Sequence, residues 1–172
     1  MGEGARGVRK AKPQVCSHTD LSGRETCVVY GVSRRGRGFG FLVAKQLEKR
    51  GFTFGIVHPE AEHIGGWIPA RHVKELTSLP DVAILCSPPA RSGEILTELA
   101  EAGLRRVYAS WGSMDQNGRD VARERGLEIC EDCPLLHIDG LGFPHNLHRR
   151  WVRWRSLSSC RMEHAGRVGG SP

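Results

Sequence analysis

Short apolar runs alternate along the middle of the chain with segments whose apolar residues recur at helical spacing. The runs predict five strands, at residues 27–30, 52–57, 82–86, 106–110 and 127–130. Helices are predicted between them, and three end at a glycine typical of a left-handed C-cap: Gly51, Gly103 and Gly126. On the first helix, the apolar face consists of Gly40, Val43, Ala44 and Leu47. A short strand at 66–68 and a short helix at 71–78 are also expected.

This alternation predicts βαβ units, and therefore a parallel sheet with right-handed crossovers. The expected fold class is α/β, a Rossmann-like doubly wound parallel sheet in three layers. The run at 82–86 is the most continuous, as expected for a central strand buried on both faces. Ligands of such sheets bind at the carboxyl ends of the strands, near the point where the strand order reverses. The candidate site therefore comprises residues 31–40, 57–59, 86–89 and 110–112.

A glycine-rich turn follows the first strand and leads directly into the first helix. Its pattern is Gly31-x-Ser33-x-x-Gly36-x-Gly38, which differs from the dinucleotide fingerprint because Ser33 stands where the second glycine would fall. Such a turn brings backbone N–H groups and a helix N-terminus against a phosphate. Charge for a phosphate is offered by Arg34, Arg35 and Arg37. The alternative is a tight turn with solvated arginines.

The residue type at the end of the second strand indicates which nucleotide a site of this kind would bind. Enzymes that use NAD usually place an acid there to hold the ribose hydroxyls. Here the residues are Val57-His58-Pro59, and the next acid, Glu60, follows the proline. This disfavours NAD, whereas His58 keeps open an NADP site in which it would face a 2′-phosphate, beside its interpretation as an ordinary loop residue.

Composition favours one globular domain with a polyanionic partner. The chain has 172 residues, a mass of 19.0 kDa and a net charge of +6, from 25 Lys and Arg against 19 Asp and Glu. No apolar stretch approaches the roughly 18 residues of a membrane span. The first residues lack the apolar core of a secretory signal, so we expect a cytoplasmic protein.

Most of the excess of positive over negative charge lies near the two ends of the chain, in residues 1–12 and 145–167. Residues 1–24 are expected to form a flexible basic arm, and residues 139–172 a basic extension that is largely disordered after residue 155. The stretch His148–Arg155 mixes arginine with tryptophan, a composition found in nucleic-acid contacts. Nucleic-acid binding is disfavoured because no reader module surrounds this stretch.

The six cysteines allow two further interpretations. Cys130 and Cys133 form a Cys-x-x-Cys motif, which can be redox-active or supply half of a zinc site with His145 and His148. The histidine spacing is shorter than in zinc fingers, and Cys130 continues an apolar strand. Buried structural cysteines are therefore favoured, and no metal is expected.

Five short motifs together resemble one known family. They are, in chain order, Gly31-Val-Ser33, His58-Pro59, Cys86-Ser-Pro-Pro89, Ala102-Gly103 and Cys133-Pro134. Their order and spacing resemble the small stand-alone CoA-binding proteins, whose domain is also the first domain of the succinyl-CoA synthetase alpha subunit. The resemblance covers residues 25–138, which would form the CoA-binding Rossmann-like domain.

The resemblance implies a protein that holds CoA or an acyl-CoA. It implies that Gly31, Ser33 and Arg34 contact phosphates, that His58 and Pro59 lie near the adenosine, and that Ser87 to Pro89 run along the pantetheine. With the residues of the other strand ends, the expected binding set is Gly31, Ser33, Arg34, Gly36, Gly38, His58, Pro59, Ser87, Pro88, Pro89, Trp111 and Gly112.

No nucleophile and base are recognisable in this set, so binding without catalysis is expected. Asp115 and Asp132, near strand ends, are interpreted as helix caps or loop residues rather than catalytic acids. An NAD(P)-dependent oxidoreductase or a redox sensor remains the alternative. The acyl group, the pathway, a protein partner and a homodimer are left open by the sequence.

Overall fold

The computed structural model describes Leu21 and residues 23–138. Five strands form one parallel sheet in the order β2-β1-β3-β4-β5. The strands are β1 (Cys27–Tyr30), β2 (Phe54–Val57), β3 (Val82–Leu85), β4 (Arg106–Ala109) and β5 (Glu128–Glu131). The predicted parallel sheet is thus confirmed, and each strand lies within about two residues of its predicted run.

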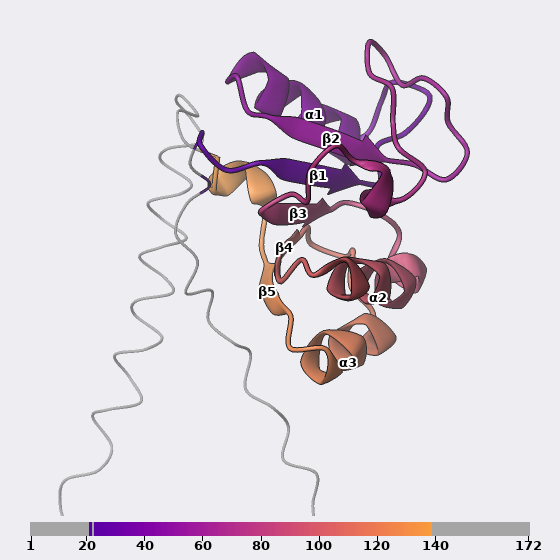
Figure 1. Ribbon diagram of the computed structural model, residues 1–172, viewed down its shortest axis with the longest axis vertical. Coiled ribbons are helices and arrows are strands. Elements are labelled where there is room, and N and C mark those ends of the chain that lie inside the picture. Colours follow the sequence, from indigo (N-terminus) through magenta and orange to yellow (C-terminus); the bar gives the residue numbers. More distant parts are fainter. Residues whose placement is uncertain (1–20, 22, 139–172) are drawn as a thin grey trace, which may run out of the picture.

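Helices cover both faces of the sheet, which gives the three predicted layers. Helix α1 (Phe39–Lys49) lies above the sheet in Figure 1, whereas α2 (Ser92–Ala102) and α3 (Gln116–Glu124) lie below it. A short 3₁₀ turn, Pro134–Leu136, contacts α1 on the upper face. The fold is therefore the Rossmann-like doubly wound sheet that the alternating pattern predicts.

The sheet divides the core into two apolar layers, because successive side chains of a strand point to opposite faces. Val29 and Ile84 pack with α1, whereas Val28 and Leu85 pack with α2, and all four are fully buried. Burial of each such side chain stabilises the fold by about 1.5–3 kcal/mol. Leu21 also belongs to the upper layer, and its N–H donates to the carbonyl of His137.

The glycines expected at helix ends have the backbone conformation that they were predicted to adopt. Gly51, Gly103 and Gly126 all have positive φ, at +70°, +92° and +64°. The predicted apolar face of α1 is buried in full. Asp115 caps α3, since its carboxylate accepts the N–H of Gly118 at 2.8 Å.

The segment between β2 and β3 departs from two predictions. The strand expected at 66–68 is wrong: Ile64 and Trp67 instead close a tight turn on each other. The helix expected at 71–78 is reduced to a 3₁₀ turn, Val73–Glu75. Tertiary contacts with Phe41 and Phe54, rather than a sheet ladder, hold Trp67 in place.

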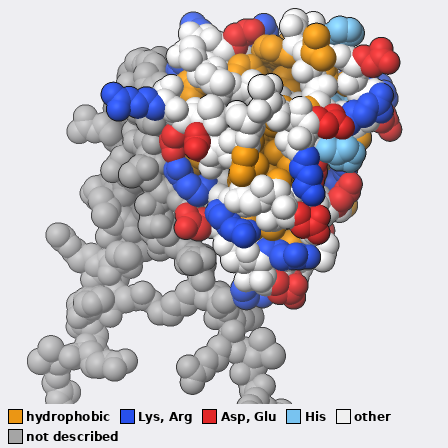
Figure 2. Space-filling model, in the orientation of Figure 1, with side chains coloured by type: hydrophobic (Ala, Val, Ile, Leu, Met, Phe, Trp, Pro, Cys, Tyr) orange, Lys and Arg blue, Asp and Glu red, His pale blue; other side chains and the backbone are white. Residues whose placement is uncertain are grey.

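The predicted arm at 1–24 and the extension at 139–172, with its Trp-containing stretch, lie largely or wholly outside the described residues. Among the helices of the described part, none is long and apolar enough to cross a membrane. On the face shown in Figure 2, Lys and Arg side chains are interspersed with Asp and Glu rather than gathered in one basic area.

Candidate functional site

An open pocket of about 230 Å³ lies at the carboxyl ends of β1, β2 and β3, where the strand order reverses between β1 and β3. Its walls come from the turn after β1, the end of β2, the exit from β3 and the first turns of α2. It is lined by Tyr30, Gly31, Val32, Ser33, Val57, His58, Pro59, Arg71, His72, Ser87, Pro88, Arg91, Glu94, Ile95 and Glu98. This is the place that the doubly wound topology predicts for a ligand.

Two glycines let the backbone close up at the turn after β1. Gly31 has φ +82°, and a Cβ on it would lie 2.4 Å from the carbonyl carbon of Cys86. A Cβ on Gly40 would lie 2.4 Å from the carbonyl oxygen of Gly31. Both contacts are with backbone, so the exit of β3 and the first turn of α1 can approach β1 only because these positions lack side chains.

The amino end of α1 is open to an anion. Its N-cap is Gly38, which has φ +93° and no side chain to accept from the first N–H groups. The first turn of the helix also contains no acidic residue. The helix dipole and the uncapped N–H groups therefore favour a negative group beside the turn.

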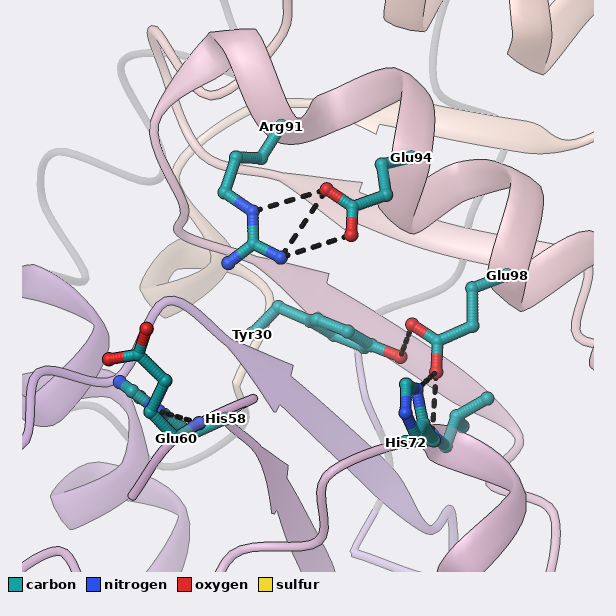
Figure 3. A network of polar contacts seen from close by, with 8 residues as sticks. Tyr30, His58, Glu60, His72, Arg91, Glu94 and Glu98 are labelled. Atoms are coloured by element: carbon teal, nitrogen blue, oxygen red, sulfur yellow. Dashed lines mark hydrogen bonds and ion pairs between the residues drawn. The ribbon is translucent and has the colours of Figure 1, made fainter.

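One of the carboxylates that line the pocket, that of Glu98, already accepts hydrogen bonds from the protein itself. The Glu98 carboxylate accepts a hydrogen bond from the Tyr30 hydroxyl at 3.2 Å and another from the Val73 N–H at 2.9 Å (Figure 3). His72 Nδ1 lies 3.5 Å from the same carboxylate. Burial and the neighbouring Glu98 charge raise the pKa of Tyr30, so its hydroxyl stays protonated as a hydrogen-bond donor.

His58, at the end of β2, is half-buried and uncharged at neutral pH. Its Nδ1 accepts the N–H groups of Glu60 and Ala61 at 3.2 and 3.0 Å, so the neutral ring carries its proton on Nε2. Burial, together with the positive charges of Arg34 and Arg91, lowers the pKa of His58. The negative charge of Glu60 acts in the opposite direction and does not outweigh these effects.

Ser87, at the exit of β3, holds a buried hydroxyl without a partner. The residue is 6% exposed, and its Oγ makes no hydrogen bond within the described part of the chain. An unsatisfied buried polar atom costs about 1–3 kcal/mol, so native proteins keep one mainly where a ligand or water completes it. Since Ser87 lines the pocket, this atom points to a bound partner.

Two of the arginines around the pocket are paired with carboxylates. Arg34 contacts Glu60 at 3.3 Å, which joins the turn after β1 to the end of β2. Arg91 contacts Glu94 at 3.2 Å within the first turn of α2 (Figure 3). Both pairs are exposed and contribute little to stability, so an anionic ligand can compete for either guanidinium.

Half of the predicted binding residues line this pocket: Gly31, Ser33, His58, Pro59, Ser87 and Pro88. The other six, Arg34, Gly36, Gly38, Pro89, Trp111 and Gly112, do not line it. Gly36 and Gly38 belong to the adjoining turn, and Trp111, which follows β4, is 68% exposed. Their roles stay predictions.

The sequence reasoning missed the pocket residues on α2 and before the 3₁₀ turn at 73–75. Arg91, Glu94 and Glu98 could have been found, because a helix that follows a parallel strand begins at the carboxyl edge of the sheet. Arg71 and His72 carry no such signal in the sequence. Only the tertiary pairing of Ala70 with Val57 brings them to the pocket.

Of the Cys-x-x-Cys motif, Cys133 is a free thiol. Burial raises the pKa of Cys133, which disfavours the reactive thiolate. Cys130 is fully buried and its Sγ lies 3.8 Å from His137 Nε2. Within the described residues no group of three or more His, Cys, Asp or Glu side chains could hold a metal ion, and His145 and His148 lie outside them.

A doubly wound parallel sheet with a pocket at its reversal point defines a Rossmann-like domain. A family model described as a CoA binding domain matches residues 25–139. The chain therefore belongs to the CoA-binding domain family, which confirms the resemblance seen in the five motifs. No curated protein sequence matches the chain.

Solved structures show the same fold. A conserved hypothetical protein from Pyrococcus furiosus is 25% identical, with a TM-score of 0.57 over 63% of this chain and 92% of that chain. A hypothetical protein from Pyrococcus horikoshii OT3 is 20% identical, with a TM-score of 0.61 over 74% and 94%. An acetyl-coenzyme A synthetase from Ca. Korarchaeum cryptofilum is 18% identical, with a TM-score of 0.52 over 62% of this chain and 25% of that chain.

Proposed function

We propose that this protein binds CoA or an acyl-CoA in the pocket between β1, β2 and β3, with the diphosphate on the turn from Gly31 to Gly38. Membership of the CoA-binding domain family supports the identity of the ligand. The uncapped amino end of α1 supports the position of the diphosphate, since backbone N–H groups there have no side-chain acceptor. Residues 25–138 would form the binding unit.

The single observation that carries the position of the ligand is the unpartnered hydroxyl of Ser87. It lies at the exit of the central strand β3, beside the turn, since a Cβ on Gly31 would lie 2.4 Å from the backbone nitrogen of Ser87. The proline pair that follows gives this exit no N–H donors at Pro88 and Pro89, so the Ser87 hydroxyl is the polar group that the wall offers. It can donate to, or accept from, an amide of the pantetheine arm.

We infer further that the protein holds its ligand without transforming it, and hands it to a protein partner. The polar groups of the pocket are engaged in ways that suit binding rather than proton transfer. Tyr30 is held protonated, and Glu98 already accepts two hydrogen bonds. An oxidoreductase that uses NAD would place an acid on the ribose at the end of β2, where Glu60 instead pairs with Arg34. The NADP alternative, which needs no such acid, is tested by the titration below.

Calorimetric titration of the purified protein with CoA, dephospho-CoA, NAD and NADP tests the proposal. We expect CoA to bind and NAD not to bind. Tight NADP binding without a response to CoA would overturn the assignment.

The variant Ser87→Ala tests the position of the ligand. We expect it to weaken CoA binding about three- to tenfold, the value of one neutral hydrogen bond, and to leave the free energy of unfolding unchanged or raised. Ser113→Ala is the matched control, because the buried Ser113 hydroxyl donates to the Ser110 carbonyl at 2.7 Å and does not line the pocket. It should lower stability and leave CoA affinity alone. If Ser113→Ala weakens CoA binding and Ser87→Ala does not, the ligand does not contact the exit of β3.

A further inference from the structure

We propose that Arg71 binds the phosphate on the ribose of the ligand and thereby makes the protein prefer CoA over dephospho-CoA. This inference rests on the proposed binding of CoA and assigns a specificity-determining residue within the same pocket.

Arg71 reaches the pocket through a backbone contact at the end of β2. Ala70 forms a parallel bridge with Val57: its carbonyl accepts the N–H of His58, and its own N–H donates to the Ile56 carbonyl, both at 2.9 Å. The Arg71 N–H then donates to the Glu75 carboxylate at 2.8 Å. The backbone at residue 71 is therefore fixed on both sides, beside the last residues of β2.

The guanidinium of Arg71 differs in its contacts from those of Arg91, which also lines the pocket, and of Arg34, in the adjoining turn. Arg34 and Arg91 are each paired with a carboxylate, as described above. Arg71 has no carboxylate within ion-pairing distance among the described residues, and its Nη1 donates only to the Pro59 carbonyl, at 3.4 Å. That long contact leaves the planar fork of N–H groups available for a phosphate, which it can bind with two parallel hydrogen bonds.

The topology places the ribose near this guanidinium. When a diphosphate lies on the turn after β1 of a doubly wound sheet, the ribose lies over the end of the neighbouring strand, β2. At that position an acid binds free ribose hydroxyls, whereas an arginine binds a ribose phosphate. Here the position is flanked by His58, Pro59 and Arg71. CoA carries a ribose phosphate and dephospho-CoA does not, so the pocket has the charge that CoA requires.

Titration of CoA and of dephospho-CoA into the full-length protein, Arg71→Gln and Arg123→Gln tests this assignment. In the unmodified protein we expect CoA to bind more tightly by on the order of ten- to a hundredfold, the value of charged hydrogen bonds. Arg71→Gln should remove most of that difference, by weakening CoA while leaving dephospho-CoA within about threefold. Arg123→Gln is the control, because Arg123 lies on α3, pairs with Asp120 and does not line the pocket.

The outcomes separate this inference from the proposed function. If Arg71→Gln weakens both ligands equally, Arg71 does not bind the ribose phosphate, although CoA binding stands. If the unmodified protein binds NADP more tightly than NAD and does not distinguish CoA from dephospho-CoA, the assignment is overturned. Failure of the unmodified protein to bind CoA overturns both proposals. Because Arg71 is exposed, the urea midpoint of the variant should match that of the unmodified protein, which verifies that it folds.

Discussion

His58 in the pocket is subject to two effects at once: its ring accepts local hydrogen bonds, and the positive charges of neighbouring arginines act on it. Its Nδ1 is committed to two backbone N–H groups, and the charges of Arg34 and Arg91 act on its ring. These contacts fix the tautomer and keep the ring neutral until a negative group arrives. A bound phosphate should therefore change the pKa of His58.

We expect CoA to raise the pKa of His58, because phosphate charge favours the imidazolium that Arg34 and Arg91 now disfavour. Binding then takes up a proton, so affinity should rise as the pH falls through the pKa of His58 in the complex toward its lower pKa in the free protein. The measurement is an NMR titration of the imidazole resonances with and without saturating CoA. The His58 signal is assigned by its absence in His58→Gln. An unchanged pKa would mean that the phosphates lie away from the end of β2.

His58 in the free protein has the opposite linkage to stability. Its folded-state pKa lies below the unfolded value, so the folded protein binds fewer protons there than the unfolded chain. The contribution of this residue to stability is therefore complete above its unfolded pKa of about 6.5, and it is lost as the pH falls from there through the lower folded-state pKa.

At the scale of elements, the contact of the turn after β1 with the exit of β3 determines the shape of the site. Gly31 and Gly38 both have positive φ, at +82° and +93°, but their surroundings differ. A Cβ on Gly31 meets the backbone at Cys86 and Ser87, whereas a Cβ on Gly38 meets nothing within 4 Å. Substitution of Gly38 therefore tests backbone strain alone, whereas substitution of Gly31 adds a steric clash to that strain.

We expect Gly38→Ala to cost about 1–3 kcal/mol of unfolding free energy, because φ +93° with ψ 176° is a backbone conformation that is essentially restricted to glycine. Gly31→Ala should cost at least about 3 kcal/mol, or prevent folding, because the clash with β3 is added to that strain. Urea denaturation followed by circular dichroism measures both variants. Equal costs would show that β1 and β3 can separate at the turn without penalty.

At the scale of the whole molecule, Leu21 and Ile138, which are far apart in the sequence, pack together in the apolar layer between the sheet and α1. Leu21 and Ile138 form a parallel bridge, both are fully buried, and the Leu21 N–H donates to the His137 carbonyl at 2.7 Å. Leu21 falls within the segment predicted as an arm, so the packed part of the chain begins before Arg24.

A chain shortened to residues 21–139 should therefore keep both its stability and its CoA affinity. A chain shortened to 25–139 should lose about 2–5 kcal/mol of unfolding free energy, comparable to truncation of a buried leucine, because Leu21 would be removed from the core. Thermal unfolding and calorimetric titration of the two truncated proteins make the comparison. Loss of CoA binding from the 21–139 chain would assign a binding role to the basic ends.

How far the sequence predicts this protein depends on the range of the interactions involved. The strands, the helix-ending glycines and the N-cap at Asp115 follow from local pattern and were predicted, since each depends on residues close in the chain. The strand at 66–68 was predicted wrongly, because Trp67 looks like a strand residue until its packing on Phe41 and Phe54 is known. Of the pocket, the segments that directly follow strands were found, whereas Arg71 and His72 were not.

The sequence by itself determined the parallel α/β fold, the edge of the sheet where a ligand would bind and the CoA-binding family. These depend on periodicity, on the C-terminal ends of apolar runs and on short motifs in order. Only the tertiary structure decided which charges the pocket contains. Arg34 is paired with Glu60, Ser87 lacks a partner and Arg71 lies beside β2, and each of these follows from which distant parts of the chain meet at the pocket and the adjoining turn. Charge pairing and solvation depend on distances in space, which a linear pattern does not contain.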